Sequence, residues 1–196
     1  AKRVYGDTIP GHQPDKRLIV TKEPIGVTAA ITPWNFPFLI VSQKLPFALA
    51  AGCTAVVKPS ELTSASTLHL GALLLEAGLP AGVVNILAGT GADVGAFLVS
   101  DPRVDMISFT GSTKVGKAAM AVAAGTLKKV SMELGGKNPQ IVFPDADLDA
   151  AADAVVFGAY FNAGECCNAG SRLLVHRSIA EDFVASVRER ARTVPV

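Results

Sequence analysis

Short apolar segments alternate with helix-like segments along most of the 196-residue chain, and this alternation limits the fold more than any other feature. The strand-like segments span residues 27–31, 54–57, 83–87, 105–109 and 128–133, and most are apolar throughout. Strands of this kind are typical of a parallel sheet that helices cover on both faces. The sequence therefore predicts an α/β fold, in which ligands bind at the carboxyl ends of the strands.

The two ends of the chain differ from this pattern. Residues 1–24 are polar and turn-rich, with a turn at 11–15 and a strand at 17–21, and predict a two-stranded arm. Such an arm lacks stability alone, so we expect it to pack against something, such as another subunit. From residue 136 the pattern predicts a strand (138–143), a helix (145–161), a strand (172–176) and a helix (179–191). We therefore expect three parts: 1–24, 25–135 and 136–196.

Charge and composition exclude several classes of protein. The net charge is +1 and 49% of residues are hydrophobic, which argues against a nucleic-acid partner and against disorder. No apolar run approaches the roughly twenty residues that span a membrane. The cysteines Cys53, Cys166 and Cys167 form no disulfide framework, so we expect a reducing, cytoplasmic setting. Neither they nor the three scattered histidines match a metal-site spacing, and we expect no metal.

Two glycine-rich turns could hold a phosphate. Gly111–Gly116 follows a strand and opens a helix, but Thr113 stands where the dinucleotide fingerprint has its second glycine. Gly89 and Gly91 form a competing turn, and both turns also suit any α/β protein. Likewise, Lys58 and Glu61 beyond a strand could hold ribose hydroxyls, or could simply begin a solvated helix.

Three further residues have side chains that could take part in catalysis. Asn35 lies between Pro33 and Pro37, which would hold its amide rigidly enough to donate to an oxyanion, or merely form a packed turn. Glu133 lies at a strand end, where desolvation would suit a general base, although an ordinary exposed carboxylate is the alternative. Cys167 lies in a loop of small residues whose N–H groups could stabilise a thiolate. The alternative is that Cys167 is a buried, inert cysteine. We expect Cys53 to be a cysteine of that inert kind.

Taken together and in order, these segments resemble the aldehyde dehydrogenase superfamily, NAD(P)-dependent and of the hydrolytic type. The resemblance rests on five blocks and the sequence that follows the last of them: Pro-Trp-Asn-Phe-Pro (33–37), Lys-Pro-Ser-Glu (58–61), Phe-Thr-Gly-Ser (109–112), Glu-Leu-Gly-Gly-Lys (133–137), Gly-Glu-Cys-Cys (164–167) and Ala-Gly-Ser-Arg (169–172). Chance agreement of five such blocks in order is negligible. The resemblance implies a central fragment of a longer chain, with a Rossmann-like cofactor domain and the start of a catalytic domain.

The resemblance implies a role for each catalytic position. Cys167 matches the nucleophile, and Cys166 occupies the variable position before it. Glu133 matches the general base that activates water, Asn35 the oxyanion donor alongside the Cys167 N–H, and Lys44 a proton relay. The implied reaction oxidises an aldehyde to a carboxylic acid through a cysteine hemithioacetal and a thioester.

The resemblance also implies the cofactor and its contacts. NAD is favoured over NADP, because the Glu61 carboxylate would repel a 2′-phosphate. Lys58 and Glu61 would hold the adenosine ribose, Gly91 and Val115 the adenine, and Ser112 the pyrophosphate. The full set of predicted cofactor residues is Ile31, Pro33, Trp34, Lys58, Ser60, Glu61, Gly91, Phe109, Thr110, Gly111, Ser112, Val115, Gly116, Leu134 and Gly135.

The implied organisation assigns residues 1–24 to an oligomerisation arm, 25–135 to the NAD-binding domain and 136–196 to the opening of the catalytic domain. We expect a homodimer or homotetramer for the full-length parent, a small aldehyde as substrate, and no membrane partner. The alternative is a non-catalytic fragment that binds dinucleotide or another protein without turnover. An acylating dehydrogenase that passes the thioester to coenzyme A is disfavoured, because Glu133 is present.

Overall fold

The computed structural model describes residues 3–195, which form two compact units with a boundary between Glu133 and Leu134. Each unit is described below by itself. Our predicted boundary lies two residues further along, between 135 and 136. Residues 1, 2 and 196, which we had assigned to the arm and to the catalytic segment, lie outside the described residues. The functions assigned to the three parts remain predictions.

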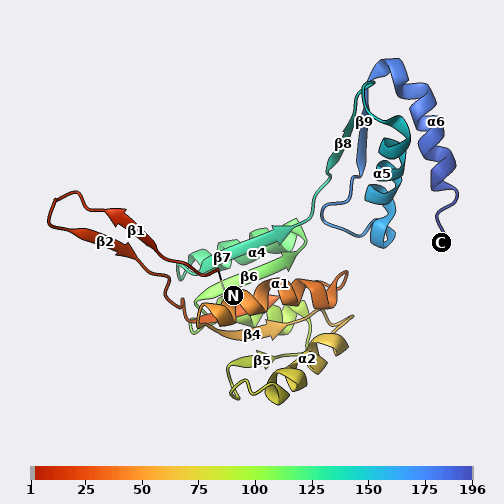
Figure 1. Cartoon of the computed structure of the whole chain (residues 1–196). Coiled ribbons are helices and arrows are strands. Elements are labelled where there is room, and N and C mark those ends of the chain that lie inside the picture. The colour runs from red at the N-terminus through yellow and green to blue at the C-terminus, as the bar shows by residue number, and fades with distance from the viewer. Residues whose placement is uncertain (1–2, 196) are drawn as a thin grey trace. The chain divides into compact units, whose positions relative to one another are not determined.

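A five-stranded sheet forms the centre of the first unit (Figure 1). Its strands are β3 (Val27–Ile31), β4 (Thr54–Lys58), β5 (Val84–Ile86), β6 (Met106–Gly111) and β7 (Lys129–Leu134), in the order β5-β4-β3-β6-β7. β3 pairs in parallel with both β4 and β6, and β4 pairs in parallel with β5. The strand order therefore reverses between β3 and β6, the place where open α/β sheets bind ligands. The predicted α/β class with a parallel sheet is confirmed.

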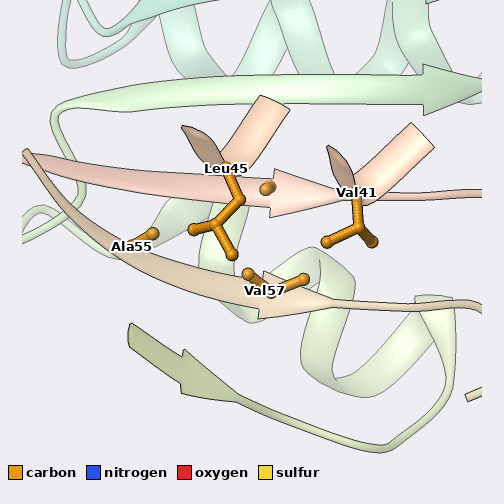
Figure 2. Packing of buried hydrophobic residues seen from close by; sticks show 5 residues of the cluster. Val41, Leu45, Ala55 and Val57 are labelled. Atoms are coloured by element: carbon orange, nitrogen blue, oxygen red, sulfur yellow. The ribbon is translucent and has the colours of Figure 1, made fainter. Parts of the chain in front are cut away.

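Helices cover both faces of this sheet. From α1 (Pro37–Ala50), Val41 and Leu45 point onto Ala55 and Val57 of β4 and form one buried cluster with Ala30 (Figure 2). Leucines of α2 (Ala65–Glu76) extend this cluster. On the opposite face lie α3 (Ala96–Ser100), preceded by a π-helical turn at Gly91–Gly95, and α4 (Thr113–Ala124). The strands β3, β4 and β6 are thus covered on both sides, as their apolar sequences require, whereas the edge strand β7 is mostly exposed.

The predicted arm is an antiparallel hairpin of β1 (Asp7–Pro10) and β2 (Arg17–Val20). Every residue of both strands is exposed, and these include the apolar side chains of Ile9, Leu18 and Ile19. A two-stranded ribbon has no buried face of its own. The hairpin therefore leaves apolar side chains exposed.

The second unit is a small α/β layer. β8 (Pro139–Val142) pairs in parallel with β9 (Arg172–Val175), and α5 (Leu148–Tyr160) makes the crossover that a parallel pair needs. α6 (Ala180–Ala191) packs on α5, and together they bury Val142, Ala152, Val155 and Phe183. The Asp147 side chain caps α5 by accepting the N–H of Ala150. Short 3-10 turns occupy Phe161–Gly164 and Arg177–Ile179.

The largest difference from the predicted elements is the start of α1. After the strand-like segment at 27–31, the sequence pattern predicts a helix from Val41 to Gly52, whereas α1 begins four residues earlier at Pro37. Proline suits the first helical position because its fixed φ is helical and its missing N–H would be unpaired there anyway. Within residues 3–195, no helix combines the length and apolar character needed to cross a membrane.

Candidate active site

A cavity of about 400 Å³ lies between α3, α4 and the sheet. Ile31, Gly91, Phe109 and Val115, all predicted to contact the cofactor, line its wall. The sequence prediction missed the other lining positions, which are small or apolar: Gly95, Ala96, Val99, Ser100, Ala118, Ala119 and Val122. The sequence does contain a signal for the α4 face that lines the cavity. Apolar residues recur there at helical spacing, at Val115, at Ala118 and Ala119, and at Val122. The cavity has the apolar character that suits a flat aromatic base.

The segment after β4 places Lys58 beside Glu61, and the distance from Lys58 Nζ to Glu61 Oε2 is 2.9 Å. The Lys58 side chain is 4% exposed and that of Glu61 is 48% exposed. The hydrogen bond from Lys58, with further backbone N–H donors that include Gly91, lowers the pKa of Glu61. An ionised carboxylate is thus held at a strand end, close to Gly91 of the cavity wall. Ser60, also predicted here, is buried.

The ends of β3 and β6 meet at the point where the strand order reverses. Because Ile31 pairs with Phe109, Thr32 and Thr110 are the next residues along the two strands. Both threonines are buried, and among the described residues neither hydroxyl oxygen has a hydrogen-bond partner. Buried polar groups without partners cost free energy, so a polar ligand or an ordered water at this point would stabilise the pair. Thr110 was predicted, whereas Thr32 was not, because its burial depends on neighbouring strands.

The N-terminus of α4 follows directly. The Ser112 hydroxyl accepts the N–H of Val115 at 3.3 Å and caps the helix. Gly116 is buried in the first turn of α4, and Gly111 ends β6. A capped helix start with a serine hydroxyl suits an anion such as a diphosphate. After β3, Pro33 is half-buried and Trp34 is exposed.

A second cavity, of about 500 Å³, contains two of the predicted catalytic residues, Lys44 and Glu133. The Lys44 ammonium donates to Ser108 Oγ at 3.0 Å. Burial lowers the pKa of Lys44, and the charge of Glu133 opposes that shift. Glu133 is exposed in this unit, so the desolvation that we expected for its carboxylate is not found within the first unit. Asn35 is half-buried in the loop between β3 and α1.

The two neighbouring thiols lie in the second unit, in the loop between the turn at Phe161–Gly164 and β9. Cys167 is exposed. Cys166 is half-buried, and its thiol donates to Phe161 O at 3.5 Å. Burial, followed by the charges of Cys167 and Glu165, raises the pKa of Cys166. Cys167 is thus the most exposed of the three cysteines, whereas Cys53 is buried in the first unit, in agreement with the prediction for it.

The structure thus groups the predicted residues by unit. The first unit holds the cofactor positions from Ile31 to Gly116, together with Asn35, Lys44 and Glu133. The second unit holds Cys167 and also Leu134, the last residue of β7, and Gly135, which follows it. Among residues 3–195, no three His, Cys, Asp or Glu side chains cluster as metal ligands would.

The first unit is a doubly wound α/β layer with a cavity at its strand ends, and the second unit contains an exposed cysteine. The sequence model of the aldehyde dehydrogenase family matches residues 1–196. The chain belongs to the aldehyde dehydrogenase family.

Individual relatives agree with this assignment. The chain is 52% identical over 188 residues to a glutarate-semialdehyde dehydrogenase of Pseudomonas aeruginosa, covering 96% of this chain and 39% of the relative. It has the same identity over 188 residues, and the same coverage, with an NADP-dependent succinate-semialdehyde dehydrogenase of Escherichia coli. The crystal structure of an NAD-dependent aldehyde dehydrogenase from Sinorhizobium meliloti matches with a TM-score of 0.93 at 49% identity, covering 97% of this chain and 38% of that one. The chain spans about 39% of the length of these curated relatives.

Proposed function

We propose that this chain supplies the nucleophile and the cofactor pocket of an enzyme that oxidises an aldehyde to a carboxylic acid with NAD or NADP. The observation that carries the proposal is the contrast between two neighbouring thiols. Cys167 is exposed, whereas Cys166 is half-buried and bonded to a backbone carbonyl. Cys167 also occupies the position of the family's nucleophile. An accessible thiolate is what attack on a carbonyl carbon requires.

The residues of the first unit fit a dinucleotide. The apolar cavity of about 400 Å³ suits adenine, and the Lys58–Glu61 pair suits ribose hydroxyls. Ser112 and the start of α4 suit the pyrophosphate. The hydroxyls of Thr32 and Thr110 have no hydrogen-bond partner among the described residues and offer the dinucleotide further polar contacts. When bound, NAD(P) supplies the acceptor for the hydride. Glu61 disfavours a 2′-phosphate, so we favour NAD.

The chemical steps rest on side chains of this chain. The Cys167 thiolate adds to the aldehyde carbon and forms a hemithioacetal, whose oxyanion the Asn35 amide and the Cys167 N–H stabilise. Loss of hydride leaves a thioester on Cys167. Glu133 then takes a proton from water, which attacks the thioester and releases the acid. Lys44, which lines the same cavity as Glu133, would relay that proton.

The test is NADH formation by the complete gene product that contains this chain. The aldehydes are succinate semialdehyde, glutarate semialdehyde and betaine aldehyde. We expect turnover with at least one of them, a loss of more than about a thousandfold in Cys167→Ala, and retained turnover in Cys166→Ala. Turnover that survives Cys167→Ala would overturn the proposed mechanism.

The second candidate, dinucleotide binding without turnover, is favoured by one observation. The apolar cavity and the Lys58–Glu61 pair lie wholly within the first unit, whereas Cys167 lies in the second. The first unit therefore carries these cofactor contacts without the nucleophile. Calorimetry with NAD⁺ on the 196-residue chain, beside the NADH assay, separates the two functions. Tight binding with no turnover in the complete gene product would establish the second.

The hairpin supports the expected homo-oligomer. Its strands expose Ile9, Leu18 and Ile19, which a partner subunit could cover. Light scattering of the complete gene product measures its mass. A monomer would contradict this assignment of the arm.

A further inference from the structure

The loop that carries Cys167 has no regular secondary structure of its own between residues 165 and 171. Its carbonyl groups therefore need partners other than a helix or a strand ladder. Two side chains from the start of β8, Asn138 and Gln140, supply those partners, and all the residues involved belong to the second unit.

Asn138 lies directly before β8. Its Nδ2 donates to Cys167 O at 2.9 Å and to Ala169 O at 3.2 Å. A side-chain amide has two N–H donors, so both are used on this loop. The Asn138 backbone carbonyl also accepts the N–H of Arg172 at 3.2 Å, where the loop enters β9. Asn138 is thus hydrogen-bonded to three positions of the loop: Cys167, Ala169 and Arg172.

Gln140 fixes the far side of the loop. Its Nε2 donates to Gly170 O at 2.9 Å and to Val155 O of α5 at 3.2 Å. The Gly170 N–H donates to Gly158 O, also in α5, at 2.8 Å. These bonds join the loop to the helix whose Val155 side chain is part of the core of this unit. The loop is therefore anchored to both a strand and a helix.

Close packing leaves the loop little room to shift. A Cβ added at Gly136 would lie 2.8 Å from Cys167 O, and one added at Gly170 would overlap the Gln140 amide. The space beside Gly136 is thus too small for a side chain, and it adjoins the same carbonyl that Asn138 binds. Hydrogen bonds and close packing therefore both surround the carbonyl group of Cys167.

We propose that Asn138 and Gln140 are positioning residues that hold the Cys167 loop in the geometry for attack. The inference rests on the proposed function of Cys167 as nucleophile. With its carbonyl held, Cys167 keeps one backbone conformation, so its sulfur and its N–H stay aligned on the same carbonyl group of the substrate. Displacement of a reacting group by about 1 Å costs on the order of a hundredfold in rate. Neither amide ionises, and each acts on the reaction through the backbone of the Cys167 loop.

The test measures kcat and the rate of Cys167 alkylation by iodoacetamide in the complete gene product. The variants are Asn138→Leu, which branches at the same carbon but is larger and has no donor, Asn138→Ser, which keeps one donor, and Gln140→Leu. Mass spectrometry of the peptide that contains residues 166 and 167 assigns the alkylated sulfur. The matched control is Asn85→Leu, since Asn85 makes the same kind of bond, to Gly82 O at 2.9 Å, in the first unit.

We expect both leucine variants to lower kcat and the alkylation rate about ten- to a hundredfold, with Asn138→Ser in between. The KM for NAD⁺ should stay within about twofold, because the predicted contacts of its adenosine half lie in the first unit. Asn85→Leu should leave all three values unchanged.

Rates within about twofold of wild type in the leucine variants would overturn the proposal. So would losses that merely follow the folded fraction measured by circular dichroism. If Cys167→Ala retains turnover, the proposed function fails instead, and the alkylation rates still decide whether the two amides position the loop.

Discussion

At the scale of single residues, burial distinguishes side chains of the same chemical type. Lys58 and Lys44 each pair with one polar side chain, but Lys58 bonds a carboxylate and Lys44 a hydroxyl. Cys53 and Cys167 are both thiols, yet one is buried and the other exposed. Reactivity follows from these environments, because desolvation and neighbouring charges set which protonation state is stable.

The first prediction concerns Glu61 and the choice of cofactor. Glu61→Gln keeps the shape of the side chain and removes its charge, so repulsion of a 2′-phosphate disappears. We expect the ratio of kcat/KM for NADP⁺ to that for NAD⁺ to rise about tenfold. Steady-state kinetics of the complete gene product measures the ratio, and Glu76→Gln, at the end of α2, is the control. An unchanged ratio would mean that Glu61 does not select the cofactor.

The second prediction concerns Asp101 and pH. Hydrogen bonds from the Arg103 guanidinium and backbone N–H lower the pKa of Asp101 to about 2. Because the folded-state pKa is below the unfolded value, the bonds stabilise the protein above pH 4 or so and lose that effect as the pH falls toward 2. Asp101→Asn should therefore reduce the free energy of unfolding at pH 7 and reduce it less at pH 3. Urea denaturation at both pH values checks this, and a pH-independent difference would contradict it.

At the scale of elements, local sequence determines where most helices and strands lie. The predicted strand at 172–176 is β9, Arg172–Val175, and the predicted helix from 179 to 191 is α6, Ala180–Ala191. α1 differs because it begins at Pro37 and continues through Pro46. An internal proline normally disfavours a helix, and here the burial of Val41 and Leu45 outweighs that preference. Packing thus overrides local propensity in this helix.

The third prediction tests packing inside α2. Thr67 is fully buried, and within residues 3–195 its hydroxyl oxygen has no hydrogen-bond partner. Thr67→Val replaces that hydroxyl with a methyl group of the same size, so we expect the free energy of unfolding to rise by about 1 kcal/mol. Thr67→Ser keeps the hydroxyl and loses a methyl, so it should be destabilising. Chemical denaturation measures both, and a destabilised valine variant would show that the hydroxyl has a partner in solution.

At the scale of the whole molecule, stability is expected to vary with burial. Ala29, Val57 and Ile107 on the central strands are almost completely buried, whereas both strands of the hairpin are exposed throughout. Amides open at a free-energy cost that follows the local packing. Backbone amides in different parts of the chain should therefore open at different free-energy costs.

The fourth prediction is the resulting order of hydrogen exchange. Amides of β3, β4 and β6 should exchange most slowly in the first unit, and those of β1 and β2 at least about a hundredfold faster. Mass spectrometry of the 196-residue chain in deuterated buffer measures the rates. Repeating the measurement on the complete gene product tests the arm, because an oligomer that covers the hairpin would slow its exchange. Equal rates for the hairpin and the sheet in the 196-residue chain would contradict the prediction.

The succession of strands and helices, the parallel sheet and the ordered blocks of the family can all be predicted from the sequence, because hydrophobic periodicity and turn residues are local properties. Three features become visible in the folded chain alone. Thr32 is buried beside Thr110, α3 and α4 enclose an apolar cavity, and Asn138 binds the Cys167 carbonyl. Each of these depends on contacts between residues distant along the chain, and one sequence alone does not specify which distant residues meet.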